Sequence, residues 1–396
     1  MTDRAPSWKD LDAHLADWRL RRFTRDEAYF RWQREALSAG DIAALHEQVE
    51  HKRGGSAQDE TAFYDLSADP DILPVLYSQR YDYYLAVGPF VAARLTGAST
   101  VLDFGCGPGI LTTYYARCWP QTRVTGVDRS QASILEAQRK ADALNLKNVH
   151  FACVDLEAGT LAGTYDCIVA THALVQSEHD RGLPSRSWRT FERAQDDAAQ
   201  SAFERRTGLG PRLDRLAAAV APAGRAIVFE KTRQMSRRIP LQRALAARGF
   251  RLVEQPLPVR YALVEEVSDD GPFFVLSRGE DHDIVWTEEP EPDDGLPFES
   301  ARARAHATPT ADVPLYENHW PSAQRVWERL CDKRVIREDT ADEPDGRQFH
   351  VELGTAEGLR YLYCANTFDQ RQLVIVEPAR AAMLHTYYQE IIQGSA

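Results

Sequence analysis

The residues best suited to chemistry in this sequence begin with an apolar segment that ends at an aspartate and runs into three closely spaced glycines. The segment reads VLDFGCGPG over residues 101–109, with Asp103 followed by Gly105, Gly107 and Gly109. Glycine tolerates positive φ and lets a ligand approach the backbone. A helix that begins after such a turn presents free N–H groups. The pattern predicts a strand, a ligand-binding turn and a helix, although dinucleotide-binding folds use a similar turn.

Two more acidic residues stand at the ends of predicted strands. Asp128 ends the segment RVTGVD, and Asp155 ends the segment NVHFACVD. An acidic residue at the end of the second strand can accept hydrogen bonds from both hydroxyls of a ribose. Folds that bind nicotinamide dinucleotides share this feature, so Asp128 alone does not identify the ligand.

The order and spacing of these motifs resemble those of the class I S-adenosylmethionine-dependent methyltransferases. Thr171 and His172 follow the fourth predicted strand, where that family has its fourth motif, and a helix, a Pro-x-Gly turn and a strand follow at 216–230. The resemblance covers residues 61–280. It implies an α/β fold with a Rossmann-like seven-stranded sheet that closes in an antiparallel hairpin. It also implies S-adenosylmethionine as the methyl donor and S-adenosylhomocysteine as the product.

The resemblance further implies which residues contact the donor. They lie before the first strand, in the glycine-rich turn and at the ends of three later strands: Arg80, Tyr81, Asp103, Gly105, Cys106, Gly107, Gly109, Asp128, Arg129, Asp155, Leu156 and Thr171. Asp103 could instead anchor the turn, and Asp155, whose counterpart in this family pairs with the adenine amino group, could be an ordinary loop acid. Tyr81 belongs to a run of aromatic residues that could equally face a helical core. We expect Cys106 to pack in the turn rather than act as a nucleophile.

Methyl transfer asks for little covalent help from a protein. In-line attack on a sulfonium methyl group releases a neutral thioether, so aligning the reactants supplies most of the acceleration. A hydroxyl acceptor needs a general base to remove its proton, whereas an amine or carboxylate acceptor depends less on a base. Three residues near the end of the fourth strand are candidates for that base: His172, Glu178 and His179. Alternatively, His172 lines the donor pocket, and Glu178 and His179 lie in a solvated loop. Because the cysteines and histidines lack zinc-site spacing, no metal site is predicted.

The acceptor is less well defined by the sequence. The fourth strand is not followed by the Asn/Asp-Pro-Pro-Tyr motif of adenine and glutamine amine methylation, and the net charge of −12 disfavours phosphate binding. A nucleic-acid acceptor is therefore disfavoured. We expect an oxygen or nitrogen acceptor on a small molecule, a natural-product peptide or a protein. Trp188, Arg189 and Phe191, in the long charged stretch 177–212, could contact the acceptor or could simply pack.

Two other functions remain open at this point. The chain could be an RNA methyltransferase guided by its C-terminal domain. It could also be a regulatory or assembly protein that binds S-adenosylmethionine without turnover.

Changes in composition divide the chain into four parts. These are a helical segment at 1–60, the methyltransferase-like domain at 61–280, an acidic linker with Pro and Ala at 281–312, and an α-β-β-β-α domain at 313–396. The first part could be a packing element or lid, or could grip a substrate or form a dimer. Within it, the Thr24–Glu27 capping-box spacing predicts the start of one helix and Asp41 the N-cap of the next. We expect the last part to contact a protein or to form a homo-oligomer.

The composition describes an ordinary globular chain. Its 396 residues are 43% hydrophobic and 27% charged, and its six cysteines include no Cys-x-x-Cys pair. Such cysteines are typical of reduced thiols in a cytoplasmic protein. No apolar run approaches the about 18 residues of a membrane helix, and the polar start is unlike a signal peptide. The sequence therefore predicts a cytoplasmic enzyme.

Overall fold

The computed structural model divides into two compact units. The first comprises residues 1–180, 201–233 and 241–286, and the second comprises 181–200, 234–240 and 287–396. The residues that the structure describes are 8–54, 57–155, 157–175, 180–264, 270–279, 283–290, 298, 314–343 and 346–394. Most of the predicted linker at 281–312 lies outside them. Among the described helices, none is both long and apolar enough to cross a membrane.

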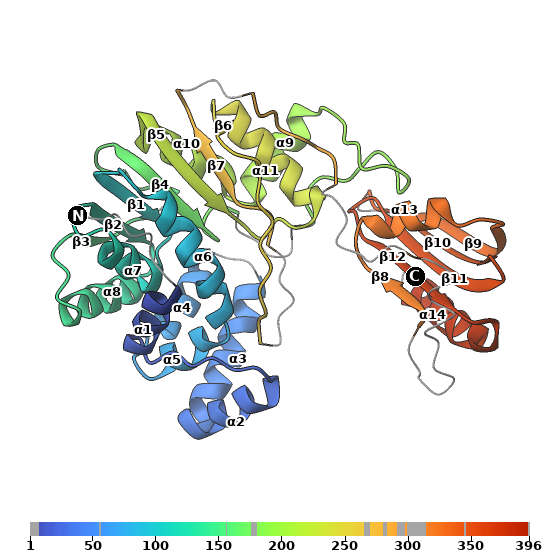
Figure 1. Ribbon diagram of the computed structural model, residues 1–396, viewed down its shortest axis with the longest axis horizontal. Coiled ribbons are helices and arrows are strands. Elements are labelled where there is room, and N and C mark those ends of the chain that lie inside the picture. The colour runs from blue at the N-terminus through green and yellow to red at the C-terminus, as the bar shows by residue number, and fades with distance from the viewer. Residues whose placement is uncertain are drawn as a thin grey trace. The chain divides into compact units, whose positions relative to one another are not determined.

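The first unit is built on a seven-stranded sheet (Figure 1). Its strands are β1 (Thr100–Phe104), β2 (Arg123–Asp128), β3 (Val149–Cys153), β4 (Tyr165–Thr171), β5 (Val220–Phe229), β6 (Arg251–Leu252) and β7 (Phe274–Ser277). They lie in the order β3-β2-β1-β4-β5-β7-β6, and β7 runs antiparallel to both of its neighbours. The predicted seven-stranded α/β sheet and its antiparallel close are confirmed.

The parallel register brings the predicted ligand-binding residues to one edge of this sheet. Asp103 on β1 pairs with Gly126 on β2 and with Val169 on β4. The three strands therefore end side by side, and the residues that follow each strand meet at their carboxyl ends. In open α/β sheets, ligands bind at that edge.

Helices cover the sheet and extend the first unit at its N-terminal side. They are α1 (Trp8–Asp17), α2 (Asp26–Ala36), α3 (Ala39–Gly54), α4 (Ala57–Ser67), α5 (Ile72–Ser78), α6 (Tyr81–Arg94), α7 (Ile110–Cys118), α8 (Gln131–Ala143), α10 (Leu209–Ala219) and, shared with the second unit, α9 (Asp197–Arg206) and α11 (Met235–Ala247). In Figure 1 the N-terminal helices, drawn in blue, gather beside α6 and α7. Leu11, Leu15 and Trp18 are buried in one apolar cluster with Val87 of α6 and Tyr115 of α7. The helical character predicted for this segment is thus confirmed, and α1 forms part of the core.

The two predicted helix caps in the N-terminal segment are wrong in detail. Helix α2 has Arg25 as its N-cap, without a side-chain hydrogen bond, so Thr24 lies outside the helix. Helix α3 begins before Asp41, and Ser38 takes the capping position. The Ser38 Oγ accepts a hydrogen bond from the Asp41 N–H at 3.1 Å, and Asp41 Oδ2 accepts one from the Ser38 N–H at 3.0 Å. This reciprocal pair is a capping box one turn earlier than predicted.

The second unit contains a five-stranded antiparallel sheet with the order β8-β12-β11-β10-β9. Its elements are β8 (Tyr316–Asn318), α13 (Ser322–Arg329), β9 (Arg334–Asp342), β10 (Gln348–Ala356), β11 (Leu359–Asn366), β12 (Arg371–Val376), the 3₁₀ turn η1 (Pro378–Arg380) and α14 (Ala381–Gly394). The predicted α-β-β-β-α order accounts for α13, β10, β11, β12 and α14, but it lacked strands β8 and β9. Strand β8 is short. Every residue of β9 is exposed, so the charged sequence of this edge strand lacks the alternation of buried apolar and exposed polar residues by which a strand is predicted.

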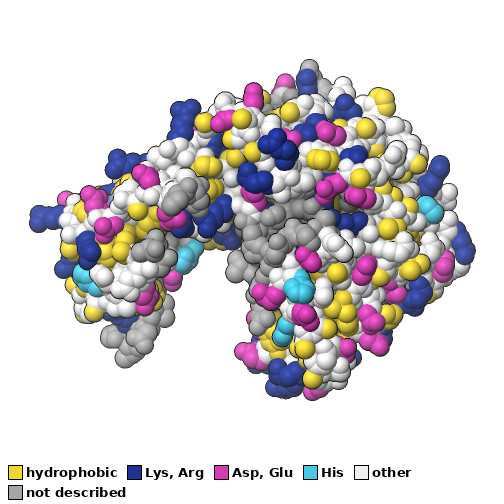
Figure 2. Space-filling view, turned by 180° about the vertical axis from the view of Figure 1, so that it is seen from behind, with side chains coloured by type: hydrophobic (Ala, Val, Ile, Leu, Met, Phe, Trp, Pro, Cys, Tyr) yellow, Lys and Arg dark blue, Asp and Glu magenta, His cyan; other side chains and the backbone are white. Residues whose placement is uncertain are grey.

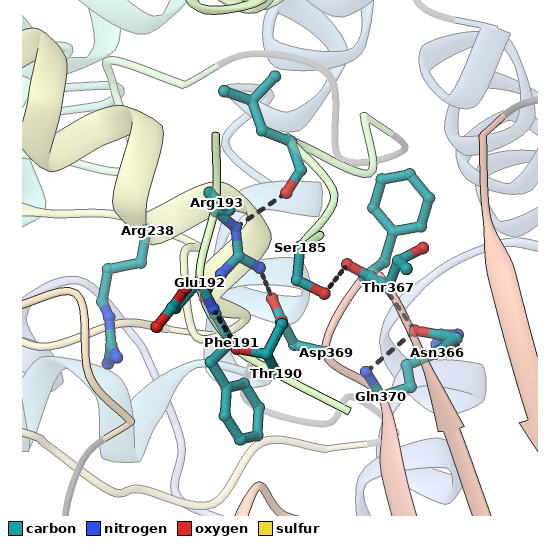
Figure 3. Close-up of polar contacts among 12 residues, drawn as sticks. Ser185, Thr190, Phe191, Glu192, Arg193, Arg238, Asn366, Thr367, Asp369 and Gln370 are labelled. Carbon is teal, nitrogen blue, oxygen red and sulfur yellow. Dashed lines mark hydrogen bonds and ion pairs between the residues drawn. The ribbon is translucent and has the colours of Figure 1, made fainter. Parts of the chain in front are cut away.

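The stretch that follows β4 belongs to this second unit and packs against its sheet. The Ser185 N–H donates to the Thr367 carbonyl at 2.7 Å, and Arg193 Nε donates to the Leu183 carbonyl at 3.0 Å. Figure 3 shows the Arg193 guanidinium directed at Asp369, with which it forms an ion pair that is 1% exposed on both sides.

Of the two alternatives for Trp188, Arg189 and Phe191, the structure shows packing. Trp188 is buried in the apolar cluster of the second sheet. The Arg189 guanidinium lies 4.8 Å from the centre of the Trp188 ring, and the Arg371 guanidinium lies 4.6 Å from that of Phe191. These side chains therefore hold the stretch in place.

The Arg193–Asp369 pair predicts a large stability effect. Asp369→Asn removes the negative charge but keeps an acceptor oxygen, and should lower the free energy of unfolding by about 3 kcal/mol, because the buried guanidinium loses its counter-charge. Glu192→Gln is the matched control, since its ion pair with Arg186 is exposed and spans 3.9 Å. It should cost less than about 1 kcal/mol. Equal midpoints for the two variants in urea denaturation, followed by tryptophan fluorescence, would contradict this assignment.

Candidate functional site

The glycine-rich turn joins β1 to α7 and is hydrogen-bonded to the end of β2. Gly105, Gly107 and Gly109 all have positive φ, at 79°, 52° and 82°. The N–H groups of Gly105 and Cys106 both donate to the Val127 carbonyl, at 2.8 and 2.9 Å. The turn is thus fixed to the sheet edge by backbone contacts.

The glycines of this turn are needed for different reasons. A Cβ at Gly109 would lie 2.8 Å from the Ala137 Cβ and 3.0 Å from the Phe151 ring, so packing excludes a side chain there. A Cβ at Gly107 would have no atom within 4 Å among the residues described. The backbone at Gly107 therefore borders open space, which is what a bound ligand requires.

Asp128 connects this turn to the helix that follows β2. Its Oδ2 accepts a hydrogen bond from the Gly107 N–H at 2.8 Å, and its Oδ1 accepts one from the Ser130 N–H at 2.9 Å. Burial raises the pKa of Asp128, although both hydrogen bonds favour the carboxylate. Its neighbour Arg129 forms an ion pair with Glu60 of α4. The carboxylate of Asp128, rather than the guanidinium of Arg129, is therefore directed at the turn.

Asp103 is buried beneath the turn and anchors the first turn of α7. The Thr112 hydroxyl donates to Asp103 Oδ2 at 2.5 Å. Burial raises the pKa of Asp103 to about 7, and the charge of Asp128 contributes in the same direction. Burial also raises the pKa of the Cys106 thiol well above its usual value, which fits packing rather than nucleophilic chemistry.

His172 follows β4 in a conformation that is uncommon for residues other than glycine, with φ at 54°. Its Nε2 forms a 2.5 Å hydrogen bond with Oδ1 of Asp270, a residue that sequence reasoning missed. The imidazole packs against the rings of Tyr83 and Phe229, with centroid distances of 5.1 and 5.6 Å, and those two rings lie 6.4 Å from each other. Its Nδ1 is buried and has no hydrogen-bond partner within the described part of the chain. The ring thus has one nitrogen held and one available.

Glu230, which sequence reasoning also missed, shapes the loop around His172. Its side chain accepts hydrogen bonds from the N–H groups of Ala173, Leu174 and Val175, at 2.9, 2.8 and 3.3 Å. Its backbone carbonyl accepts the N–H of Gly271, next to Asp270, at 2.9 Å. Burial raises the pKa of Glu230. No spacing in the sequence links these residues, because Glu230 and Asp270 come from β5 and the approach to β7.

The aromatic run before the sheet places a different tyrosine at this site. The Tyr81 hydroxyl donates to Asp12 of α1 at 2.8 Å. Tyr83 instead stacks on His172, and the side chain of Thr171 lies beside its hydroxyl. Arg80 is the N-cap of α6, and its charge acts on Tyr83.

The remaining predicted site residues lie at the third strand or outside the described part. Asp155 follows β3, is exposed, and accepts a hydrogen bond from the Glu157 N–H at 2.8 Å. Leu156, Glu178 and His179 fall outside the described residues. Their predicted roles stay predictions.

Comparison with known proteins identifies relatives of the central part of the chain. Residues 101–187 match a family model described as methyltransferase domain. The chain is 38% identical over 82 residues to malonyl-[acyl-carrier protein] O-methyltransferase of Acetivibrio thermocellus, covering 21% of this chain and 28% of that protein. It is 43% identical over 92 residues to trans-aconitate 2-methyltransferase of Azoarcus sp., covering 23% and 34%. The chain thus spans about a third or less of the length of these curated relatives.

A solved structure also aligns with the chain. The N-methyltransferase NodS from Bradyrhizobium japonicum WM9, in complex with S-adenosyl-L-homocysteine, is 18% identical with a TM-score of 0.34. The alignment covers 48% of this chain and 85% of that structure.

The raised pKa of Asp103 predicts a specific pH dependence of stability. Because the folded pKa of about 7 exceeds the ordinary aspartate pKa of about 3.8, the folded state holds the proton more tightly, and stability is lost as the pH rises from 4 to 7. This loss should reach up to about 4 kcal/mol. The Asp103→Asn variant should lose correspondingly less free energy of unfolding over the same pH range, as measured by urea unfolding at several pH values. Parallel curves for wild type and variant would contradict the assignment.

Proposed function

The first unit of this chain contains a class I S-adenosylmethionine-dependent methyltransferase domain, and from this we propose that the protein transfers a methyl group from S-adenosylmethionine to an oxygen or nitrogen atom. The acceptor would belong to a small molecule, a peptide or a protein. The observation that carries the proposal is the pairing of His172 with Asp270 at the same sheet edge as the glycine-rich turn. Tyr83 lies near both the His172–Asp270 pair and Asp103 below the glycine-rich turn. Its ring stacks on His172, burial raises the pKa of its hydroxyl, and the charges of Asp270 and Asp103 both raise that pKa further.

The described residues fit the donor. Each carboxylate oxygen of Asp128 accepts one backbone hydrogen bond and keeps capacity for another, which the two ribose hydroxyls would donate. The open space at Gly107 leaves room beside this carboxylate. Among the upstream aromatic residues, Tyr83, which stacks on His172, is better placed than Tyr81, whose hydroxyl is bonded to Asp12. When bound, S-adenosylmethionine supplies an electrophilic methyl group on a positively charged sulfur.

The His172–Asp270 pair would provide the base for an acceptor that must lose a proton. With Nε2–H donating to Asp270, the neutral imidazole carries its lone pair on Nδ1, the nitrogen that lacks a partner among the described residues. Asp270 would hold this tautomer and stabilise the imidazolium after proton transfer. Packing against Tyr83 and Phe229 helps to fix the orientation of the ring.

The surface gives no separate support to an RNA acceptor. On the face that Figure 2 presents, Lys and Arg side chains are interspersed with Asp and Glu and form no continuous basic field among the described residues. The chain as a whole carries a formal net charge of −12. A contact role of the second unit with a protein partner stays a prediction.

Donor binding gives the first test, by calorimetric titration of the full chain with S-adenosylmethionine and S-adenosylhomocysteine. Both should bind. Gly107→Ala should weaken binding at least about tenfold, because its methyl group enters the open space, at a cost to folding of about 1–2 kcal/mol. Gly97→Ala is the matched control, since Gly97 also has positive φ and open surroundings but precedes β1 at the opposite sheet edge. Equal affinities of the two variants, or no binding by wild type, would refute the donor site.

The proposed base gives a second test. His172→Gln and Asp270→Asn should leave donor affinity within about threefold of wild type while lowering methyl transfer by about 10²–10⁴ for a hydroxyl acceptor. Transfer of radiolabelled methyl groups to acceptors in fractionated cell extract provides the measurement. If both variants transfer at the wild-type rate to a hydroxyl acceptor, the pair is not the base.

A further inference from the structure

Three polar side chains meet on the second unit's sheet, away from the glycine-rich turn. Strand β10 carries His350 and Glu352 on one face, and Glu352 pairs in register with Glu338 on β9. One ligand atom from each residue lies within 4.8 Å of the ligand atoms of the other two. His350 and Glu352 are buried and Glu338 is exposed, so the group reaches from the interior to the surface.

His350 directs an unpaired nitrogen at the two carboxylates. Its Nδ1 forms a 2.8 Å hydrogen bond with the Thr340 hydroxyl, and its ring stacks in parallel on Trp188 with centroids 3.7 Å apart. The residue is 1% exposed, and its Nε2 has no hydrogen-bond partner among the described residues. The nearest carboxylate oxygen, Glu352 Oε2, is 3.7 Å away, which exceeds hydrogen-bond distance.

Neighbouring side chains hold Glu352 but leave one of its oxygens free. Its Oε1 accepts hydrogen bonds from the Tyr361 hydroxyl and from Trp327 Nε1. The ammonium group of Lys333 lies 3.9 Å from the centre of the Trp327 ring and donates to the Trp327 carbonyl at 2.8 Å. Oε2 lies 3.7 Å from His350 Nε2 and accepts a hydrogen bond from none of the residues that the structure describes.

We propose that Glu338, His350 and Glu352 bind a divalent transition-metal cation of the zinc type. One imidazole nitrogen and two carboxylate oxygens form a ligand set that such ions accept, and three protein ligands leave a coordination position open. In the tautomer whose Nδ1–H donates to the Thr340 hydroxyl, the Nε2 lone pair would be free for the metal, and the bonds to Glu352 Oε1 orient that carboxylate. The inference is independent of methyl transfer, because all of these residues belong to the second unit.

The competing explanation is that His350 carries a second proton and pairs with Glu352 without a metal. That pairing would satisfy Nε2 if it brought the two atoms to hydrogen-bond distance, but they lie 3.7 Å apart. It would also leave no role for Glu338. A cation between the three groups accounts for the separation and for all three ligand atoms.

The test is calorimetric titration of chelator-treated full-length protein with ZnCl₂ and, separately, MnCl₂. Wild type should bind one Zn²⁺ with a dissociation constant at or below about 1 µM. Tryptophan emission should change on binding, since Trp188 stacks on His350 and Trp327 donates to Glu352. Glu338→Gln should weaken binding at least about tenfold without altering the fold, because its side chain is exposed.

Asp342→Asn is the matched control. Asp342 is an exposed acid on the same strand that accepts a hydrogen bond from Gln348, and asparagine can still accept it. Its affinity for Zn²⁺ should equal that of wild type. Zn²⁺ binding that survives in both Glu338→Gln and His350→Gln would overturn the proposal and place the ion elsewhere, such as at the exposed Cys153 or Cys331. No binding of either metal by wild type would overturn it as well, in favour of the protonated His350.

Discussion

The two backbone hydrogen bonds accepted by Asp128 are the contacts on which the site of the first unit depends. They join the glycine-rich turn to the end of β2 and to the start of α8. Ser130 extends the connection, because its hydroxyl donates to Asp65 of α4 at 2.6 Å. The carboxylate of Asp128 thus ties the turn after β1 to the end of β2, and the carboxylate of Asp65 adds a link through Ser130 to an N-terminal helix. The Asp128 carboxylate can also meet a ribose, so anchoring and ligand binding are functions of one group.

The opposite side of the site is organised by Glu230, which touches no expected ligand. Its side chain fixes the loop after β4 and its backbone carbonyl holds the approach to β7, so His172 and Asp270 are brought together by a third residue. The uncommon backbone conformation of His172 is tolerated because strand β4 holds the residues before it and Glu230 holds the residues after it. Such over-determined strain is typical of functional positions, and it supports a chemical role for the imidazole.

The second unit includes residues 181–200, which the sequence placed in the methyltransferase-like domain at 61–280. The stretch after β4 donates Trp188 to the core of the C-terminal sheet and pairs Arg193 with Asp369. Removal of the C-terminal residues would therefore expose the Trp188 ring and leave the Arg193 guanidinium without its partner Asp369. The same stretch covers His350, because the Trp188 ring stacks on its imidazole.

The sequence by itself determined the sheet of the first unit, because apolar strands, the glycines and the terminal acids form a local pattern with strong steric reasons. Tertiary structure alone decided that Tyr83 rather than Tyr81 stacks on His172, since neighbours on one helix point in different directions and packing selects among them. It also brought Asp270 to His172, a pairing of residues 98 positions apart. Strand β9 was not predicted because all of its residues are exposed, so its sequence has no alternation of apolar and polar residues. The register that places Glu338 opposite Glu352 was therefore not predicted either. Local sequence specifies elements, whereas contacts between distant elements depend on how those elements pack.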